Sequence, residues 1–172
     1  MSTSTPGSST GTPHQGTVTV DGDASRVELR RRYGTDGADL WDAITSPERA
    51  RRWLGALSGD LRAGGTYELR MGEGRPGADD VAHGEVLRCE PPRLLELTWH
   101  FPGEQQSHLR VEVSEDGELV LLHTRLEAAA ARDYGTGWQV VLDQLEDDAA
   151  HRPVRPWGDL WAQYAPGDDA AG

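Results

Sequence analysis

Three stretches in the middle of the sequence alternate apolar and polar residues with a period of two. In Tyr67–Met71, Leu95–Phe101 and Leu109–Val113 every second residue is apolar. This alternation is typical of antiparallel strands that bury one face and expose the other. Turn sequences separate the stretches, and Asp116-Gly117 is a hairpin signal ahead of a further strand at Glu118–Leu126. The central feature is therefore a strongly bent antiparallel sheet.

Two short helices are expected before this sheet region, after a first strand at Arg26–Tyr33. Asp36 can cap one helix, and Ser46 can cap a second in which Pro47 suits the first turn. Apolar residues then recur at helical spacing as far as Leu57. We therefore expect both helices to lie between Asp36 and Leu57.

Two further helices are expected after the last strand. Thr136-Gly137-Trp138-Gln139 has the form of a capping box, which predicts a helix of about four turns starting there. A short amphipathic helix fits Pro156–Tyr164, with Trp157 and Trp161 on one face. That stripe can pack on its own domain or on a second subunit, so the chain is expected to be a monomer or a homodimer.

Together these elements predict an α+β fold in a single domain. Residues 1–25 are rich in Ser, Thr, Gly and Pro, and we expect a disordered head because so little apolar surface can offset the entropy of ordering. The folded domain is expected to span residues 26–150, followed by an appended helix at 151–166 and a loose tail at 167–172.

The charge of the chain limits its partners. The net charge is −12, which repels nucleic-acid phosphates and anionic lipids and argues against both as partners. No apolar run is long enough for a membrane span, and no secretory signal is visible. Cys89 is the one cysteine, so no internal disulfide forms. We therefore expect a cytoplasmic protein.

Five segments occur in an order and at a spacing that match a known family. They are Leu40–Gly55 (LWDAITSPERARRWLG), Gly64–Met71, His83–Trp99, Leu122–Leu126 and Gly137–Leu145. The sequence from about Arg26 to Ala150 resembles the Hsp90 ATPase activator homologues, which belong to the START-like, helix-grip (SRPBCC) superfamily. The resemblance implies a sheet of about seven strands wrapped around a long C-terminal helix. It also implies a cavity between them, which in relatives holds lipids, polyketides, hormones or other apolar molecules.

The inward positions of the predicted strands and helices supply the candidate ligand-binding residues. Ligand pockets are mostly apolar with a few oriented polar groups, and this set has that character, although the same residues can simply fill a core. The candidates are Trp41, Trp53, Tyr67, Leu69, Met71, Leu97, Trp99, Phe101, Val111, Leu121, His123, Trp138, Val141, Leu142 and Leu145.

His123 and Tyr67 are the acid–base candidates if the protein is an enzyme. An imidazole with a pKa near neutrality can transfer a proton, and His123 matches a histidine that recurs at this strand position in the resembling family. The alternative is a buried histidine satisfied by a backbone carbonyl. His83, His100 and His108 do not form a convincing metal site, and no cofactor or metal is expected.

Three functions remain open on the sequence. The first is a non-catalytic carrier or sensor that binds a small apolar or aromatic molecule in the cavity. The second is a polyketide-type cyclase, aromatase or hydrolase that uses the same cavity. The third is a module that stimulates a chaperone ATPase, against which the sequence lacks the additional N-terminal domain of the eukaryotic activators.

Overall fold

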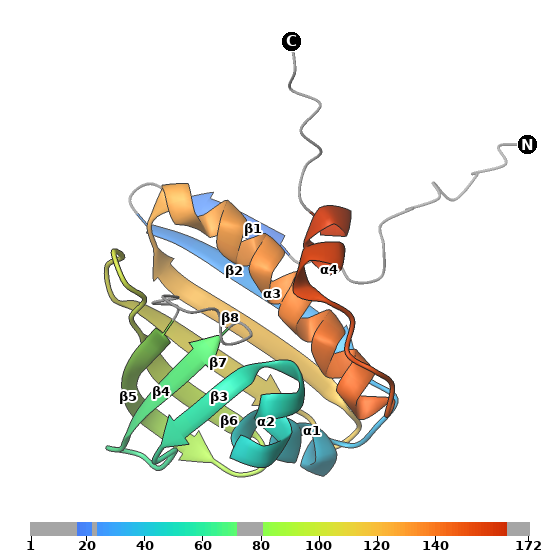
Figure 1. The fold of residues 1–172 in the computed structure, drawn as a ribbon. Helices are drawn as coiled ribbons and strands as arrows, with labels where there is room; N and C mark the ends of the chain where they lie inside the picture. Colours follow the sequence, from blue (N-terminus) through green and yellow to red (C-terminus); the bar gives the residue numbers. More distant parts are fainter. Residues whose placement is uncertain (1–16, 22–23, 72–80, 165–172) are drawn as a thin grey trace, which may run out of the picture.

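The computed structural model describes residues 17–21, 24–71 and 81–164; the predicted tail at 167–172 lies outside the described residues. These residues form one sheet with a long helix across it and three shorter helices (Figure 1). Within the described ranges, no helix has the length and apolar character needed to cross a membrane. In chain order the elements are β1 (Thr17–Asp21), β2 (Ala24–Arg32), α1 (Gly37–Thr45), α2 (Pro47–Trp53), β3 (Gly55–Gly59), β4 (Thr66–Met71), β5 (Val81–Glu90), β6 (Leu94–Trp99), β7 (Ser107–Val113), β8 (Glu118–Leu126), α3 (Ala128–Ala149) and α4 (Trp157–Tyr164).

The sheet has the antiparallel topology that the sequence predicts. The described strands follow the order β1-β2-β8-β7-β6-β5-β4-β3, and every neighbouring pair is antiparallel. Strands β2 to β8 are the seven that the family resemblance implies, and β1 adds an eighth at the edge beside β2. Helix α3 crosses one face of the curved sheet (Figure 1). The predicted α+β helix-grip architecture is confirmed.

Strand β1 corrects the predicted boundary of the head. From the sequence we expect a disordered head over residues 1–25, whereas Thr17–Asp21 pairs with β2 through five residue pairs. Alternating Thr and Val residues favour an extended backbone, because β-branched side chains fit a pleated surface. The sheet therefore begins at Thr17, and residues 1–16 lie outside the described residues.

The second short helix ends earlier than predicted. Helix α2 stops at Trp53, and Leu57, which the sequence analysis places in the helix, lies in β3 opposite Leu69 of β4. Gly55 permits this change, since its φ is +151° and a Cβ there would lie 2.2 Å from the carbonyl oxygen of Arg70. Only glycine lets the chain pass from helix to strand at this point.

The long helix begins earlier than predicted. Helix α3 starts at Ala128 and spans 22 residues, so Thr136 lies inside the helix and does not cap it. The first turn is a run of alanines, which are the best helix formers, but it carries no apolar stripe for periodicity to detect. The helix therefore extends about two turns further toward its N-terminus than the capping box suggests.

The other helix predictions are confirmed, except that Ser46 does not cap α2 through its side chain. The Asp36 side chain caps α1 by accepting a hydrogen bond from the backbone N–H of Asp39 at 2.9 Å. Pro47 opens α2. Helix α4 forms at Trp157–Tyr164, one residue inside the predicted Pro156–Tyr164, and residues 151–156 of the segment assigned to the appended helix are not helical.

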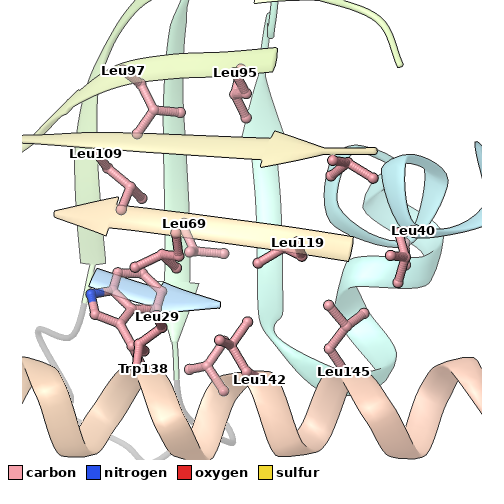
Figure 2. Packing of buried hydrophobic residues seen from close by; sticks show 14 of the residues in the cluster. Leu29, Leu40, Leu69, Leu95, Leu97, Leu109, Leu119, Trp138, Leu142 and Leu145 are labelled. Carbon is pink, nitrogen blue, oxygen red and sulfur yellow. The ribbon is translucent and has the colours of Figure 1, made fainter. Parts of the chain in front are cut away.

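Helix α3 packs its apolar face onto the sheet. Figure 2 shows Trp138, Leu142 and Leu145 projecting from this helix toward leucines of the strands. These three side chains are at most 6% exposed. Burying one leucine side chain stabilises a fold by roughly 1.5–3 kcal/mol, so this face holds the helix against the sheet.

Arginines neutralise the acidic C-terminal end of α3. Asp148 accepts a hydrogen bond from Arg49 of α2 at 2.9 Å. Asp147 accepts bonds from Arg155 at 2.9 Å and from Arg152 at 3.1 Å. Carboxylates near a helix C-terminus oppose the helix dipole, and these ion pairs offset that cost. They also tie α2 and the segment before α4 to the end of α3.

A buried ion pair joins β2, α3 and α4. Arg31 of β2 pairs with Asp143 of α3, and their side chains are 1% and 5% exposed. The hydroxyl of Tyr164 in α4 donates to the second carboxylate oxygen of Asp143 at 2.6 Å. The same guanidinium donates to the carbonyl oxygen of Gln139 at 3.2 Å. The appended helix is thus fastened to the domain by a charged group in the domain interior.

Removing the hydroxyl of Tyr164 is expected to loosen α4. Tyr164→Phe should lower the free energy of unfolding by about 1.5–3 kcal/mol, because the lost hydrogen bond is made to a charged partner. Hydrogen exchange should accelerate in α4 and stay unchanged in α1, which serves as the internal control. Unchanged exchange in α4 would mean that other contacts hold this helix.

Candidate ligand cavity

An apolar cavity of about 80 Å³ lies between the sheet and α3. Its walls come from both elements and from α1, α2 and β3, and apart from the tyrosine hydroxyl and the indole N–H groups its lining side chains are apolar. A volume of this size holds a few atoms of a ligand, not a drug-sized molecule. We call it the inner cavity; its lining residues are Ile44, Trp53, Leu54, Leu57, Leu61, Tyr67, Leu69, Leu95, Leu97, Trp99, Leu109, Val111, Leu119, Leu121, Trp138, Val141, Leu142 and Leu145.

A second cavity of about 290 Å³ adjoins the first, and we call it the outer cavity. The two share Trp99, Trp138 and Val141 as lining residues. Four of the six tryptophans in the sequence line the outer cavity, and so does the single phenylalanine of the sequence. Its lining residues are Met71, Trp99, Phe101, Glu104, Ala130, Asp133, Tyr134, Gly137, Trp138, Val141, Trp157 and Trp161.

The structure brings most of the predicted ligand-binding residues to these cavities. Met71 and Phe101 line the outer cavity, whereas Trp41 and His123 line neither of the two. Trp41 lies in α1, is 9% exposed and belongs to the hydrophobic core. The other eleven line the inner cavity: Trp53, Tyr67, Leu69, Leu97, Trp99, Val111, Leu121, Trp138, Val141, Leu142 and Leu145.

Several lining residues were missed by the sequence analysis. Tyr134 precedes the predicted start of the long helix, and Glu104 follows the predicted strand at Leu95–Phe101, so neither belonged to a pattern that marks an inward face. Trp157 and Trp161 were recognised as a stripe, and the structure places this stripe on the same domain, over the outer cavity. The helical spacing of the two tryptophans predicts that they share one face of a helix. It does not predict which surface that face packs against.

His123 is fully buried and its two ring nitrogens are both engaged. The indole N–H of Trp138 donates to Nδ1 at 2.9 Å, so the ring proton is on Nε2, which lies 2.7 Å from Oγ of Ser107. The Ser107 hydroxyl in turn donates to the carbonyl oxygen of Trp99 at 3.3 Å. His123 is therefore a buried, satisfied histidine, although its partners are an indole and a hydroxyl and not the backbone carbonyl named as the alternative.

This environment keeps His123 neutral. Burial lowers the pKa of His123 to about 3, and the neighbouring charge of His108 acts in the same direction. A proton on Nδ1 would also face the indole N–H of Trp138, which would then lose its acceptor. An acid–base role at neutral pH is disfavoured by this geometry, and the ring instead holds the indole of Trp138, which lines both cavities.

The ring of His123 is expected not to titrate in the ordinary range. Its NMR signals, assigned through contacts to Trp138, should stay constant between about pH 8 and about pH 4.5. Since the unfolded chain binds this proton near pH 6.5 and the folded chain only near pH 3, stability should fall as pH drops through that interval, by up to about 1.4 kcal/mol per pH unit from this residue. A midpoint near 6.5 would contradict this burial.

Tyr67 lines the inner cavity, but its hydroxyl is also occupied. It donates to the carbonyl oxygen of Thr98 at 2.7 Å. Burial raises the pKa of Tyr67 well above its ordinary value, so the phenol stays protonated at neutral pH. Tyr67 can shape the cavity wall, and its hydroxyl would have to leave the backbone carbonyl before it could serve a substrate.

A polar chain of three side chains lines the outer cavity. The indole N–H of Trp99 donates to the hydroxyl oxygen of Tyr134 at 3.0 Å, and that hydroxyl donates to the carboxylate of Glu104. The ring of Tyr134 also meets His123 edge-on at 4.7 Å between centroids. Hydrogen bonds therefore fix the orientation of the aromatic side chains where the two cavities meet.

Of the three histidines considered for a metal site, two lie side by side and the third lies in another strand. His83 and His100 face each other across a β-bridge with ring centroids 4.8 Å apart, while His108 lies in β7 opposite Thr98 and Thr124. Among the described residues there is no group of three His, Cys, Asp or Glu side chains placed to hold a metal ion.

Comparison with known proteins supports the fold and the family. The crystal structure of CalU16 from Micromonospora echinospora is 29% identical, with a TM-score of 0.67 over 88% of this chain and 94% of that one. The solution NMR structure of CalU16 is 27% identical, with a TM-score of 0.70 over 91% of this chain and 96% of that one. The protein encoded by BPP1335 of Bordetella parapertussis is 31% identical, with a TM-score of 0.63 over 84% of each chain. No curated protein matches at a significant level.

The family itself is identified by a sequence match over more than half of the chain. The family described as Activator of Hsp90 ATPase homolog 1-like protein matches residues 35–149, which run from α1 to the end of α3. The match includes most of the elements that line the inner cavity. The chain therefore belongs to the Activator of Hsp90 ATPase homolog 1-like family, within the START-like superfamily whose helix-grip fold it has.

Proposed function

We propose that this protein binds a small apolar or aromatic molecule in the outer cavity, as a non-catalytic carrier or sensor. The observation that carries the proposal is a cavity of about 290 Å³ lined by six aromatic side chains. That volume approaches the lower end of the range for small-molecule pockets, and mostly apolar walls with a few polar groups are typical of them. The inner cavity continues this space toward the core and can receive part of a ligand.

The enzyme alternative has less support from the geometry. Both acid–base candidates are engaged in hydrogen bonds, and His123 lines neither cavity. A cyclase that acts only by folding its substrate would not need them, so turnover remains the second candidate. The chaperone-activating alternative follows from the family description alone.

Native mass spectrometry of the freshly purified protein tests the proposal directly. A reproducible extra mass that disappears on denaturation would reveal a retained ligand, and extraction would give its chemical class. The same spectrum gives the oligomeric state. A protein that carries no extra mass should still bind N-phenyl-1-naphthylamine, a neutral probe whose fluorescence rises in apolar surroundings.

A matched pair of substitutions locates the binding. Ala130 lines the outer cavity, whereas Ala129, its neighbour on α3, is exposed and lines neither cavity. Ala130→Trp should fill the cavity and weaken probe binding at least tenfold, and Ala129→Trp should leave it unchanged. Equal binding by both variants, or no probe binding by the folded wild-type protein, would contradict the proposal.

A further inference from the structure

The outer cavity combines aromatic faces with carboxylates. Trp157 and Trp161 stack with centroids 6.0 Å apart, and Trp99 and Trp138 meet edge-on at 5.3 Å. Aromatic faces are electron-rich and attract cations, tryptophan most strongly. A cavity whose only function was to hold a neutral apolar body would not need acidic groups in its wall. The carboxylates therefore call for a ligand chemistry of their own.

Glu104 and Asp133 supply negative charge to this cavity. Both line it; Glu104 is half-buried and Asp133 is exposed. Glu104 accepts a hydrogen bond from the Tyr134 hydroxyl, which fixes its carboxylate and leaves its charge in place. Within the described part of the chain, neither carboxylate forms an ion pair, and the lining contains no arginine or histidine.

The net charge of the chain acts in the same direction. At −12 it lowers the potential around the cavity and attracts positively charged small molecules. An anionic ligand would meet two like charges and no cationic partner among the lining residues. A neutral ligand would gain no attraction from the two carboxylates. A positively charged ligand would, so the charge of the wall is complementary to a cation.

We propose that the outer cavity selects a cationic ligand: an apolar or aromatic molecule that carries a protonated amine or a quaternary ammonium group. Its positive end lies beside Glu104 and Asp133, and its apolar body lies against the tryptophans toward the inner cavity. This inference rests on the proposed function and adds the sign of the ligand charge to it.

A matched pair of probes separates charge from shape. Phenyltrimethylammonium and tert-butylbenzene have the same shape, with nitrogen replaced by carbon, and benzoate supplies a negative charge. Titrations follow the indole N–H signals of the protein by NMR. At low ionic strength we expect phenyltrimethylammonium to bind about tenfold more tightly than tert-butylbenzene, and benzoate to bind most weakly. Added salt should reduce this difference.

Two double variants show whether these carboxylates cause the preference. Glu104→Gln with Asp133→Asn removes both charges, and the new amide oxygen at position 104 can still accept the Tyr134 hydrogen bond. The affinity ratio of the two probes should then fall below about threefold. Glu48→Gln with Glu115→Gln removes two charges from exposed positions outside both cavities and should keep the ratio.

Each outcome decides between the two proposals. If both probes bind equally to the wild-type protein, the cationic preference is wrong and the apolar binding role stands. If neither probe nor N-phenyl-1-naphthylamine binds, both proposals are wrong. A preference that survives in the Glu104 and Asp133 variant, or that is lost equally in the control variant, would overturn the assignment to these carboxylates.

Discussion

Asp143→Asn is expected to lower the free energy of unfolding by about 3–5 kcal/mol. The substitution hardly changes the size of the side chain, so it creates no cavity; its effect is to leave the charge of Arg31 without a counter-ion. Both side chains are at most 5% exposed, so water cannot replace the lost carboxylate. A loss of this size is a large share of the stability of an ordinary domain.

Two further variants distinguish the stability lost by breaking the buried ion pair from the stability lost by removing any carboxylate. Asp60→Asn breaks an ion pair with Arg62 whose side chains are 47% and 85% exposed, and no measurable change is expected because exposed pairs contribute little. Arg31→Met combined with Asp143→Leu removes both buried charges and should recover most of the stability. Urea denaturation midpoints of the four proteins check this order. Equal losses for Asp143→Asn and Asp60→Asn would contradict it.

The ion pair also connects stability to the outer cavity. Asp143 holds the Tyr164 hydroxyl at the end of α4, and α4 carries Trp157 and Trp161, which line that cavity. A variant without the carboxylate should therefore lose ligand affinity as well as stability. Tyr164→Phe should show the same coupling with a smaller loss of stability.

The period-two pattern was sufficient to predict the sheet, because one face of each central strand is buried. In β4, Tyr67 and Leu69 are buried and Glu68 and Arg70 are exposed, as the alternation predicts. Strand β3 has only a weak contrast: Gly55 and Leu57 are half-buried and its other three residues are exposed. It pairs with β4, and Leu57 packs against the core. Its place depends on the close approach of Gly55 to the next strand, which local sequence does not reveal.

The cavity was predictable to the extent that inward faces were predictable. Leu97, Trp99 and Val141 lie on such faces and do line a cavity. His123 lies on an inward face too, but a partner from another element, the Trp138 indole, takes its Nδ1. Glu104 and Tyr134 meet across 30 residues of sequence, and no periodicity brings such a pair together. Contacts between distant segments decide which inward residues border a void.

Leu142→Ala is expected to lower the free energy of unfolding by about 2–5 kcal/mol, toward the upper end of that range. Leu142 is 2% exposed at the centre of α3, and it faces the leucines of the sheet (Figure 2). The substitution removes three carbon atoms from the wall of a cavity that already measures about 80 Å³. Neighbouring side chains then have more space to fill than they can reach, so the enlarged void persists.

The enlarged void should bind small apolar molecules. An apolar cavity of this kind stays dry and accepts ligands such as benzene, and a ligand that binds only the folded state raises its stability. Benzene should therefore raise the melting temperature of Leu142→Ala more than that of the wild-type protein. Leu87→Ala is the matched control, because Leu87 is 43% exposed and its loss should change stability by less than about 0.5 kcal/mol. An equal benzene effect in the wild-type protein and Leu142→Ala would mean that the wall of the inner cavity collapses after the substitution and that no additional space for a ligand opens.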